Sequence, residues 1–210
     1  MFINRSSIYN RTTALFRMIV GSITGITCFF HGCAEFLQGN KPTTDIGVKI
    51  GAITFFQNYL TAGIIVMLLS IGFIIWTFLM IKQPIVSVGI VIIAAMLFIS
   101  GGGVAFIPAS ILVFIVSLRI NNPLLKIQKR MNHGRIKEYS KYWFPTFVVG
   151  LITLATGIGI WLIVVPPWKN SNITLINYVC WILLIVSFVA LILSAYFGFI
   201  KDVSIRKNLA

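Results

Sequence analysis

Long runs of apolar residues, separated by short polar segments, make up most of the chain. A helix needs roughly 20 predominantly apolar residues to cross the ~30 Å hydrocarbon core of a bilayer, and several runs reach that length. We therefore predict an all-α fold, a polytopic integral membrane helix bundle that forms a single transmembrane domain over residues 1–210. The six predicted transmembrane helices cover about residues 18–38, 58–81, 84–100, 104–119, 144–165 and 175–200.

The longest apolar region, residues 85–118, is too long for one crossing and contains three successive glycines, Gly101, Gly102 and Gly103. Glycine has no Cβ and adopts backbone conformations that other residues avoid, so we expect these three residues to turn the chain back on itself. The second arm of this hairpin contains Pro108, and a proline inside a helix should kink it.

The composition indicates that lipid is much of the solvent of this protein. Hydrophobic residues make up 58% of the 210 residues and charged residues only 10%, whereas a soluble domain carries about 25% charged residues. In a soluble protein the net charge of +13 would suggest a nucleic-acid partner. We expect no such partner here, because basic loops that stay on the cytoplasmic side of a membrane explain the charge.

The positions of the basic residues favour one topology. With six helices and a cytoplasmic N-terminus, 14 of the 17 Lys and Arg residues lie inside and 3 lie outside. If residues 84–119 crossed only once, 5 would lie inside and 12 outside. The positive-inside rule therefore predicts six crossings and two cytoplasmic termini, in a multi-pass protein of the cell (cytoplasmic) membrane. The basic cytoplasmic loop 119–142 should bind anionic lipid headgroups, at about 1 kcal/mol per Lys or Arg near the surface.

One pair of polar side chains stands out within the apolar segments. Glu35 is the only acidic residue inside a predicted transmembrane helix, where a charged side chain costs about 2.5–3.5 kcal/mol on insertion scales. His31 lies four residues earlier, on the same face of that helix. We predict an outward-facing polar pocket centred on His31 and Glu35, with Gln38, Asn40 and Asn58 as supporting hydrogen-bonding groups.

Several roles for this pair stay open. The two side chains could satisfy each other as polar packing, form a ligand or ion pocket, relay protons, or take part in catalysis. We predict no metal site and no cofactor, because catalytic zinc usually needs three protein ligands. Cys28 has an unusual spacing for a third ligand, and His133 lies in the predicted cytoplasmic loop. Enzymatic activity is the less favoured role, since no second acidic residue in a predicted transmembrane helix could orient His31 as a base.

Glycines form a second stripe on the first helix, beside the polar one. Gly21, Gly25, Gly32 and Gly39 recur at helical spacing. Small residues in such a stripe let another helix backbone approach closely, so we expect a neighbouring helix to pack there.

The sequence HGxxExxQGN at residues 31–40 resembles the opening signature of a group of small bacterial multi-pass membrane proteins. In that group an Asn-Tyr/Phe-Leu-x-Thr-Gly segment opens the second helix and a Gly-Gly-Gly turn follows later. The counterparts here are residues 58–63 and 101–103, with Ala62 before Gly63 where the group has a threonine. The resemblance covers roughly residues 25–105. It implies that the box belongs with the second helix and the triple glycine, and it implies no particular activity.

The leading functional hypothesis is a binding or transport module whose outer pocket admits a small solute, a lipid headgroup or a proton. The small size and the absence of an internal repeat count against transport, although a homo-oligomer could compensate. One alternative is an intramembrane enzyme that uses His31 and Glu35 on a lipid substrate. Another is a non-catalytic accessory or immunity protein.

Overall fold

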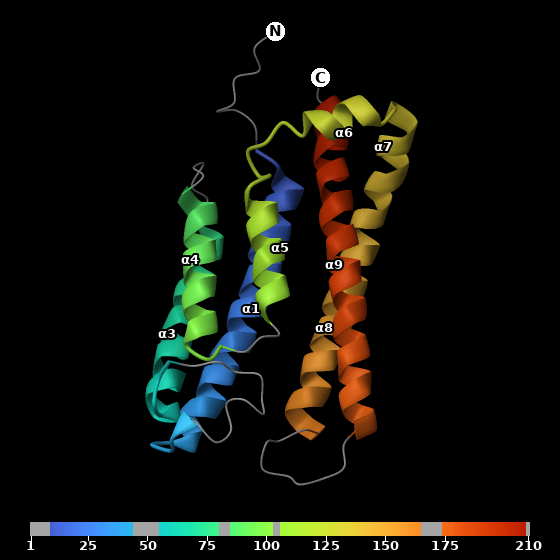
Figure 1. Cartoon of the computed structure of the whole chain (residues 1–210). Coiled ribbons are helices and arrows are strands. Elements are labelled where there is room, and N and C mark those ends of the chain that lie inside the picture. The colour runs from blue at the N-terminus through green and yellow to red at the C-terminus, as the bar shows by residue number, and fades with distance from the viewer. Residues whose placement is uncertain (1–8, 44–54, 80–84, 103–105, 165–173, 209–210) are drawn as a thin grey trace. The chain divides into compact units, whose positions relative to one another are not determined.

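The computed structural model describes residues 9–43, 55–79, 85–102, 106–164 and 174–208, and these segments contain helices and no strand (Figure 1). The all-α prediction is therefore confirmed. The helices are α1 (Arg11–Gln38), α3 (Tyr59–Phe78), α4 (Ile85–Ile99), α5 (Ile107–Ser117), α6 (Leu125–Arg130), α7 (His133–Tyr139), α8 (Trp143–Val164) and α9 (Thr174–Asn208), with the 3-10 helix η4 (Ser140–Tyr142) between α7 and α8.

Four helical stretches are long and apolar enough to cross a membrane, judged by length and composition. They are Arg11–Gln38, Tyr59–Phe78, His133–Ile160 and Tyr178–Lys207. Large apolar side chains on their outer faces are exposed rather than packed, for example Ile152 (60%) and Ile185 (60%). These helices indicate a membrane protein. The helices α4 and α5 are also apolar but shorter, with 15 and 11 residues.

The chain forms two compact units, residues 1–123 and 124–210. In the first unit α1 packs antiparallel against α3 along its length. The glycine stripe on α1 allows the two helices to approach each other closely. A Cβ added to Gly63 of α3 would lie 2.6 Å from the carbonyl oxygen of Gly32 on α1. Gly21 and Gly25 meet side chains of α3 in the same way, so the stripe is confirmed at these three positions of α1. The prediction is wrong for Gly39, which ends α1 at φ +72° with nothing within 4 Å of an added Cβ.

The first helix begins seven residues earlier than predicted, and Arg17 lies inside it. The Arg17 side chain is only 3% exposed, and its Nη2 donates a hydrogen bond of 3.0 Å to the carbonyl oxygen of Leu79. Leu79 is the C-cap of α3, where carbonyls lack helical partners and a positive charge is favourable. The sequence pattern places Arg17 before the first helix, but the structure places it inside α1, where this hydrogen bond stabilises its charge.

Hydrogen bonds at each end of the first unit show which ends of its four helices lie side by side. At one end, the backbone N–H of Asn10 donates to the carbonyl oxygen of Ile120 at 2.8 Å, so the start of α1 lies beside the exit of α5. At the other end, the N–H of Phe55 donates to the carbonyl oxygen of Ile99, so the entry to α3 lies beside the end of α4. The α4–α5 pair therefore returns the chain to the end where α1 begins (Figure 1).

Pro108 lies in the first turn of α5, which begins at Ile107. A proline there removes no helical hydrogen bond, because the first N–H groups of a helix have no partner within it. The predicted kink at Pro108 is therefore wrong.

In the second unit α8 and α9 pack antiparallel, and the hydroxyl of Ser187 donates to the carbonyl oxygen of Gly150 at 2.9 Å between them. The predicted basic loop contains α6, α7 and η4. The last helix continues to Asn208, eight residues beyond its predicted end. It continues because Ile200 and Val203 are covered by the apolar side chains of α6 and α7 and their flanks.

Candidate functional site at His31 and Glu35

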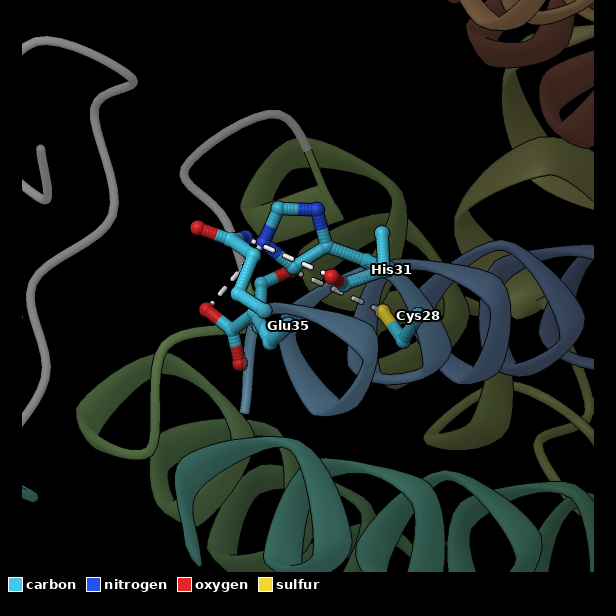
Figure 2. Close-up of polar contacts among 6 residues, drawn as sticks. Cys28, His31 and Glu35 are labelled. Atoms are coloured by element: carbon cyan, nitrogen blue, oxygen red, sulfur yellow. Dashed lines mark hydrogen bonds and ion pairs between the residues drawn. The ribbon is translucent and has the colours of Figure 1, made fainter. Parts of the chain in front are cut away.

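His31 and Glu35 lie in the last two turns of α1 and face each other (Figure 2). His31 Nε2 is 3.6 Å from Glu35 Oε1. The Glu35 side chain is 5% exposed and the His31 side chain 21% exposed. The helix sets this geometry, because side chains four residues apart stack on one face. The predicted pairing is therefore present, with the carboxylate as its buried member.

The pair leaves hydrogen-bonding capacity unused. The separation of 3.6 Å exceeds the 2.7–3.2 Å of a normal hydrogen bond. Within the described part of the chain, both His31 Nε2 and Glu35 Oε2 are buried without a hydrogen-bond partner. Buried polar atoms in proteins nearly always have a partner, and an exception calls for an explanation such as a bound species.

Backbone of the glycine turn completes one side of the site. The His31 ring lies beside the backbone of Gly101, and the Sγ of Cys28 lies 4.0 Å from the carbonyl oxygen of Gly102 (Figure 2). Gly101 has a φ of +103°, a conformation that favours glycine, and the N–H of Gly102 donates to the carbonyl oxygen of Leu97 at 2.8 Å. The third turn residue, Gly103, lies outside the described residues.

Two of the other predicted pocket residues, Gln38 and Asn58, form local hydrogen bonds. Asn58 is the N-cap of α3, and its Oδ1 accepts a hydrogen bond of 2.8 Å from the N–H of Thr61. Gln38 Nε2 donates to the carbonyl oxygen of Ala34 within α1. Asn40 is exposed at the end of α1. Among the described residues, no hydrogen bond joins Gln38, Asn40 or Asn58 to His31 or Glu35.

The glycine turn was predicted from the sequence as part of this region of the chain, and its backbone lies beside His31. The sequence pattern did not predict that backbone atoms, in place of further polar side chains, would border the pair. Among the described residues, no group of three His, Cys, Asp or Glu side chains could hold a metal ion. The pair itself consists of one carboxyl group and one imidazole, which together can hold and exchange a proton.

Comparison of the chain with known protein families, with curated proteins and with solved structures gives no match. The resemblance of residues 31–40 to a group of small bacterial membrane proteins stays a prediction.

Proposed function

We propose that this protein binds a proton at the His31–Glu35 pair and transfers it within the membrane. One observation carries the proposal. A buried carboxyl group faces an imidazole at 3.6 Å, and neither His31 Nε2 nor Glu35 Oε2 has a hydrogen bond among the described residues. A pair that served only as structural packing would be expected to satisfy these atoms, because an unpaired polar group in a membrane interior is costly.

The size of the gap favours a proton over a larger ligand between the two side chains. A ligand atom placed directly between His31 Nε2 and Glu35 Oε1, which are 3.6 Å apart, would lie far closer to both than a hydrogen bond allows. A proton needs no such space. Small side-chain shifts would bring His31 Nε2 and Glu35 Oε1 to the roughly 2.7–2.9 Å of a charge-assisted hydrogen bond. Glu35 Oε2 then remains as an acceptor through which a proton can arrive or leave.

The non-helical backbone beside the pair supports the same proposal. The helix α5 has 11 residues and so spans only about 16 Å at 1.5 Å per residue. Next to His31 the neighbouring backbone is therefore the turn at Gly101, not a helix. Irregular backbone at membrane depth occurs where it is buried in protein or lines a polar cavity, and transporters bind ions at such interrupted helices.

We also propose that both termini lie on the cytoplasmic side of the cytoplasmic membrane, and that the α4–α5 pair, predicted as two of six crossings, enters and leaves the membrane on that side. Contacts in the first unit support this topology. The α4–α5 pair brings Arg119 back to the end of the unit where Arg11 lies, because Asn10 hydrogen-bonds both Arg119 and Ile120. Basic residues thus gather at one end of the unit, as the positive-inside rule requires of a cytoplasmic face. His31 and Glu35 then lie toward the outside.

Proton flux into liposomes tests the function. The full chain is reconstituted with an entrapped pH-sensitive dye, and a potassium gradient with valinomycin drives protons inward. We expect E35Q and H31Q each to lower the flux at least about tenfold, since each removes one proton-binding atom of the pair. T27A is the matched control, because Thr27 lies on the same helix outside the predicted pocket and its hydroxyl donates to the carbonyl oxygen of Ile23. Equal flux in E35Q and the unaltered protein refutes the proposal.

A carbodiimide reaction gives a second measurement that does not depend on flux. Hydrophobic carbodiimides react with protonated carboxyl groups in apolar surroundings, and the chain has only four Asp and Glu residues. We expect one adduct, on Glu35, located by mass spectrometry and reduced in H31Q. An unmodified Glu35 alongside a modified Glu138, which is exposed, contradicts the proposal.

Single-cysteine labelling tests the topology. In a background without the three native cysteines, G134C and K41C place thiols at two exposed positions. A membrane-impermeant maleimide added to intact cells should label K41C at once and G134C only after the membrane is opened. The reverse order overturns the proposed orientation.

A further inference from the structure

The short helices of the second unit have an apolar side that the protein itself already covers. Leu124 and Ile136 form a buried cluster with Ile200 and Val203 of α9. Ile127 and Met131 pack against the same cluster. A short amphipathic helix often inserts its apolar side into lipid, but here α9 occupies that side. The helices α6 and α7 are therefore held against the end of α9.

The opposite side of these helices is strongly basic and open. On α6 the basic residues recur at positions i, i+3 and i+4, which share one face of a helix. None of the basic side chains from α6 to η4 forms an ion pair within the described residues, and Glu138 is the one acidic residue in these elements. The exposed basic residues, termed here the cationic platform, are Lys126, Lys129, Arg130, Arg135, Lys137 and Lys141.

An aromatic layer lies between the cationic platform and the apolar length of α8 and α9. The rings of Tyr139 and Tyr142 lie 6.2 and 5.8 Å from the ring of Phe197. Both tyrosines are partly exposed, at 38% and 48%. Trp143 follows at the start of α8 and stacks on Phe147 at 5.7 Å. Tyr and Trp are enriched where the hydrocarbon core meets the headgroups, so this layer places the platform at the level of the lipid phosphates.

We propose that the cationic platform binds the headgroups of anionic phospholipids of the membrane that holds α8 and α9. Phosphate is the complementary charge, and lipid phosphates are the anions present at that level at the highest concentration. The cations are held in position by the buried cluster, so binding does not require the segment to fold first. This proposal rests on the second unit alone and is independent of His31 and Glu35.

Spin-labelled lipids measure this preference on the full chain. The protein is reconstituted in phosphatidylcholine with a trace of spin-labelled phosphatidylglycerol or spin-labelled phosphatidylcholine, and the motionally restricted fraction is compared. We expect several-fold preference for phosphatidylglycerol at low salt, weaker at 0.5 M KCl because salt screens exposed charges. K129Q should reduce the preference only in part, and the triple variant K126Q/K129Q/R130Q should abolish most of it.

K41Q is the matched control, because Lys41 is an exposed lysine of the first unit, outside the platform. Its preference for phosphatidylglycerol should equal that of the unaltered protein. Equal preference in the triple variant and the unaltered protein overturns the proposal, provided their melting temperatures in detergent agree. Binding of a short oligonucleotide or an acidic peptide by the reconstituted protein, without a lipid preference, would assign the platform to another partner and overturn it as well.

Discussion

Replacement of Gly63 by alanine tests the closest approach to another backbone among the described glycines. Gly63 on α3 faces the backbone of α1. An added Cβ would lie 2.5 Å from the backbone nitrogen of Phe36 and 2.6 Å from the carbonyl oxygen of Gly32. Ordinary van der Waals contact begins near 3.4 Å. Both obstructing atoms belong to helix backbone, so no side-chain rotation relieves the clash, and α1 and α3 must move apart by roughly 1 Å at this point.

The cost of that movement can be estimated from packing energetics. A gap of 0.5–1 Å removes about a quarter to a half of the dispersion energy of each separated contact, and overpacked sites lose about 1–3 kcal/mol in total. Alanine also favours a helix over glycine by about 0.5–1 kcal/mol, which partly offsets the loss. Gly72 on the same helix has nothing within 4 Å of an added Cβ, so G72A measures the propensity effect alone. We expect G63A to be about 1–3 kcal/mol less stable than G72A.

The assay is unfolding of the full chain in mixed micelles by increasing mole fractions of sodium dodecyl sulfate, followed by far-UV circular dichroism. Because Phe36 follows Glu35 directly, G63A should also displace the His31–Glu35 pair and lower proton flux, whereas G72A should not. If G63A and G72A unfold at the same detergent fraction, α1 and α3 do not cross at Gly63 and the packing account is wrong.

Two further predictions concern the ends of α3. N58A should lower the free energy of unfolding by about 1 kcal/mol, because it removes the N-cap bond to Thr61. N58D should restore most of that stability in the same micelle assay, and a failure of rescue would argue that Asn58 does more than cap the helix. R17M should destabilise the protein by about 1–3 kcal/mol, through loss of a charged hydrogen bond to Leu79. R11Q, at an exposed position of the same helix, should change stability by less than about 0.5 kcal/mol, and equal effects of R17M and R11Q would contradict the buried role of Arg17.

Short-range regularities made much of the first unit predictable. The helical spacing of Gly21, Gly25 and Gly32 and their small size were enough to predict which face of α1 packs against a neighbour. This is possible because residues at helical spacing share one face regardless of which helix packs there. The same spacing brought His31 and Glu35 together. The prediction was wrong for Gly39, which fits the spacing but lies just past the last residue of α1. There its positive φ ends the helix.

The features that could not be predicted depend on partners distant in sequence. The charge of Arg17 argued against a helix in lipid, and only the carbonyl oxygen of Leu79, 62 residues away, makes its burial acceptable. The length of α9 depends in the same way on Ile136, which covers Ile200. Asn58 is a different case. An asparagine directly before an apolar helix is a typical N-cap, so its capping role was predictable from the sequence.

The hydrogen bonds of Asn10 have a consequence for how the first unit folds during synthesis. Its side-chain Nδ2 donates to the carbonyl oxygens of Arg119 and Asn122, which lie 109 and 112 residues later in the chain. These two acceptors are near the end of the first unit and are therefore synthesised late. The hydrogen bonds of Asn10 at the start of α1 cannot form until most of the unit has been translated. Assembly of the amino-terminal half should therefore finish as a single late event, and a nascent chain arrested shortly before residue 119 should leave the start of α1 open to proteases.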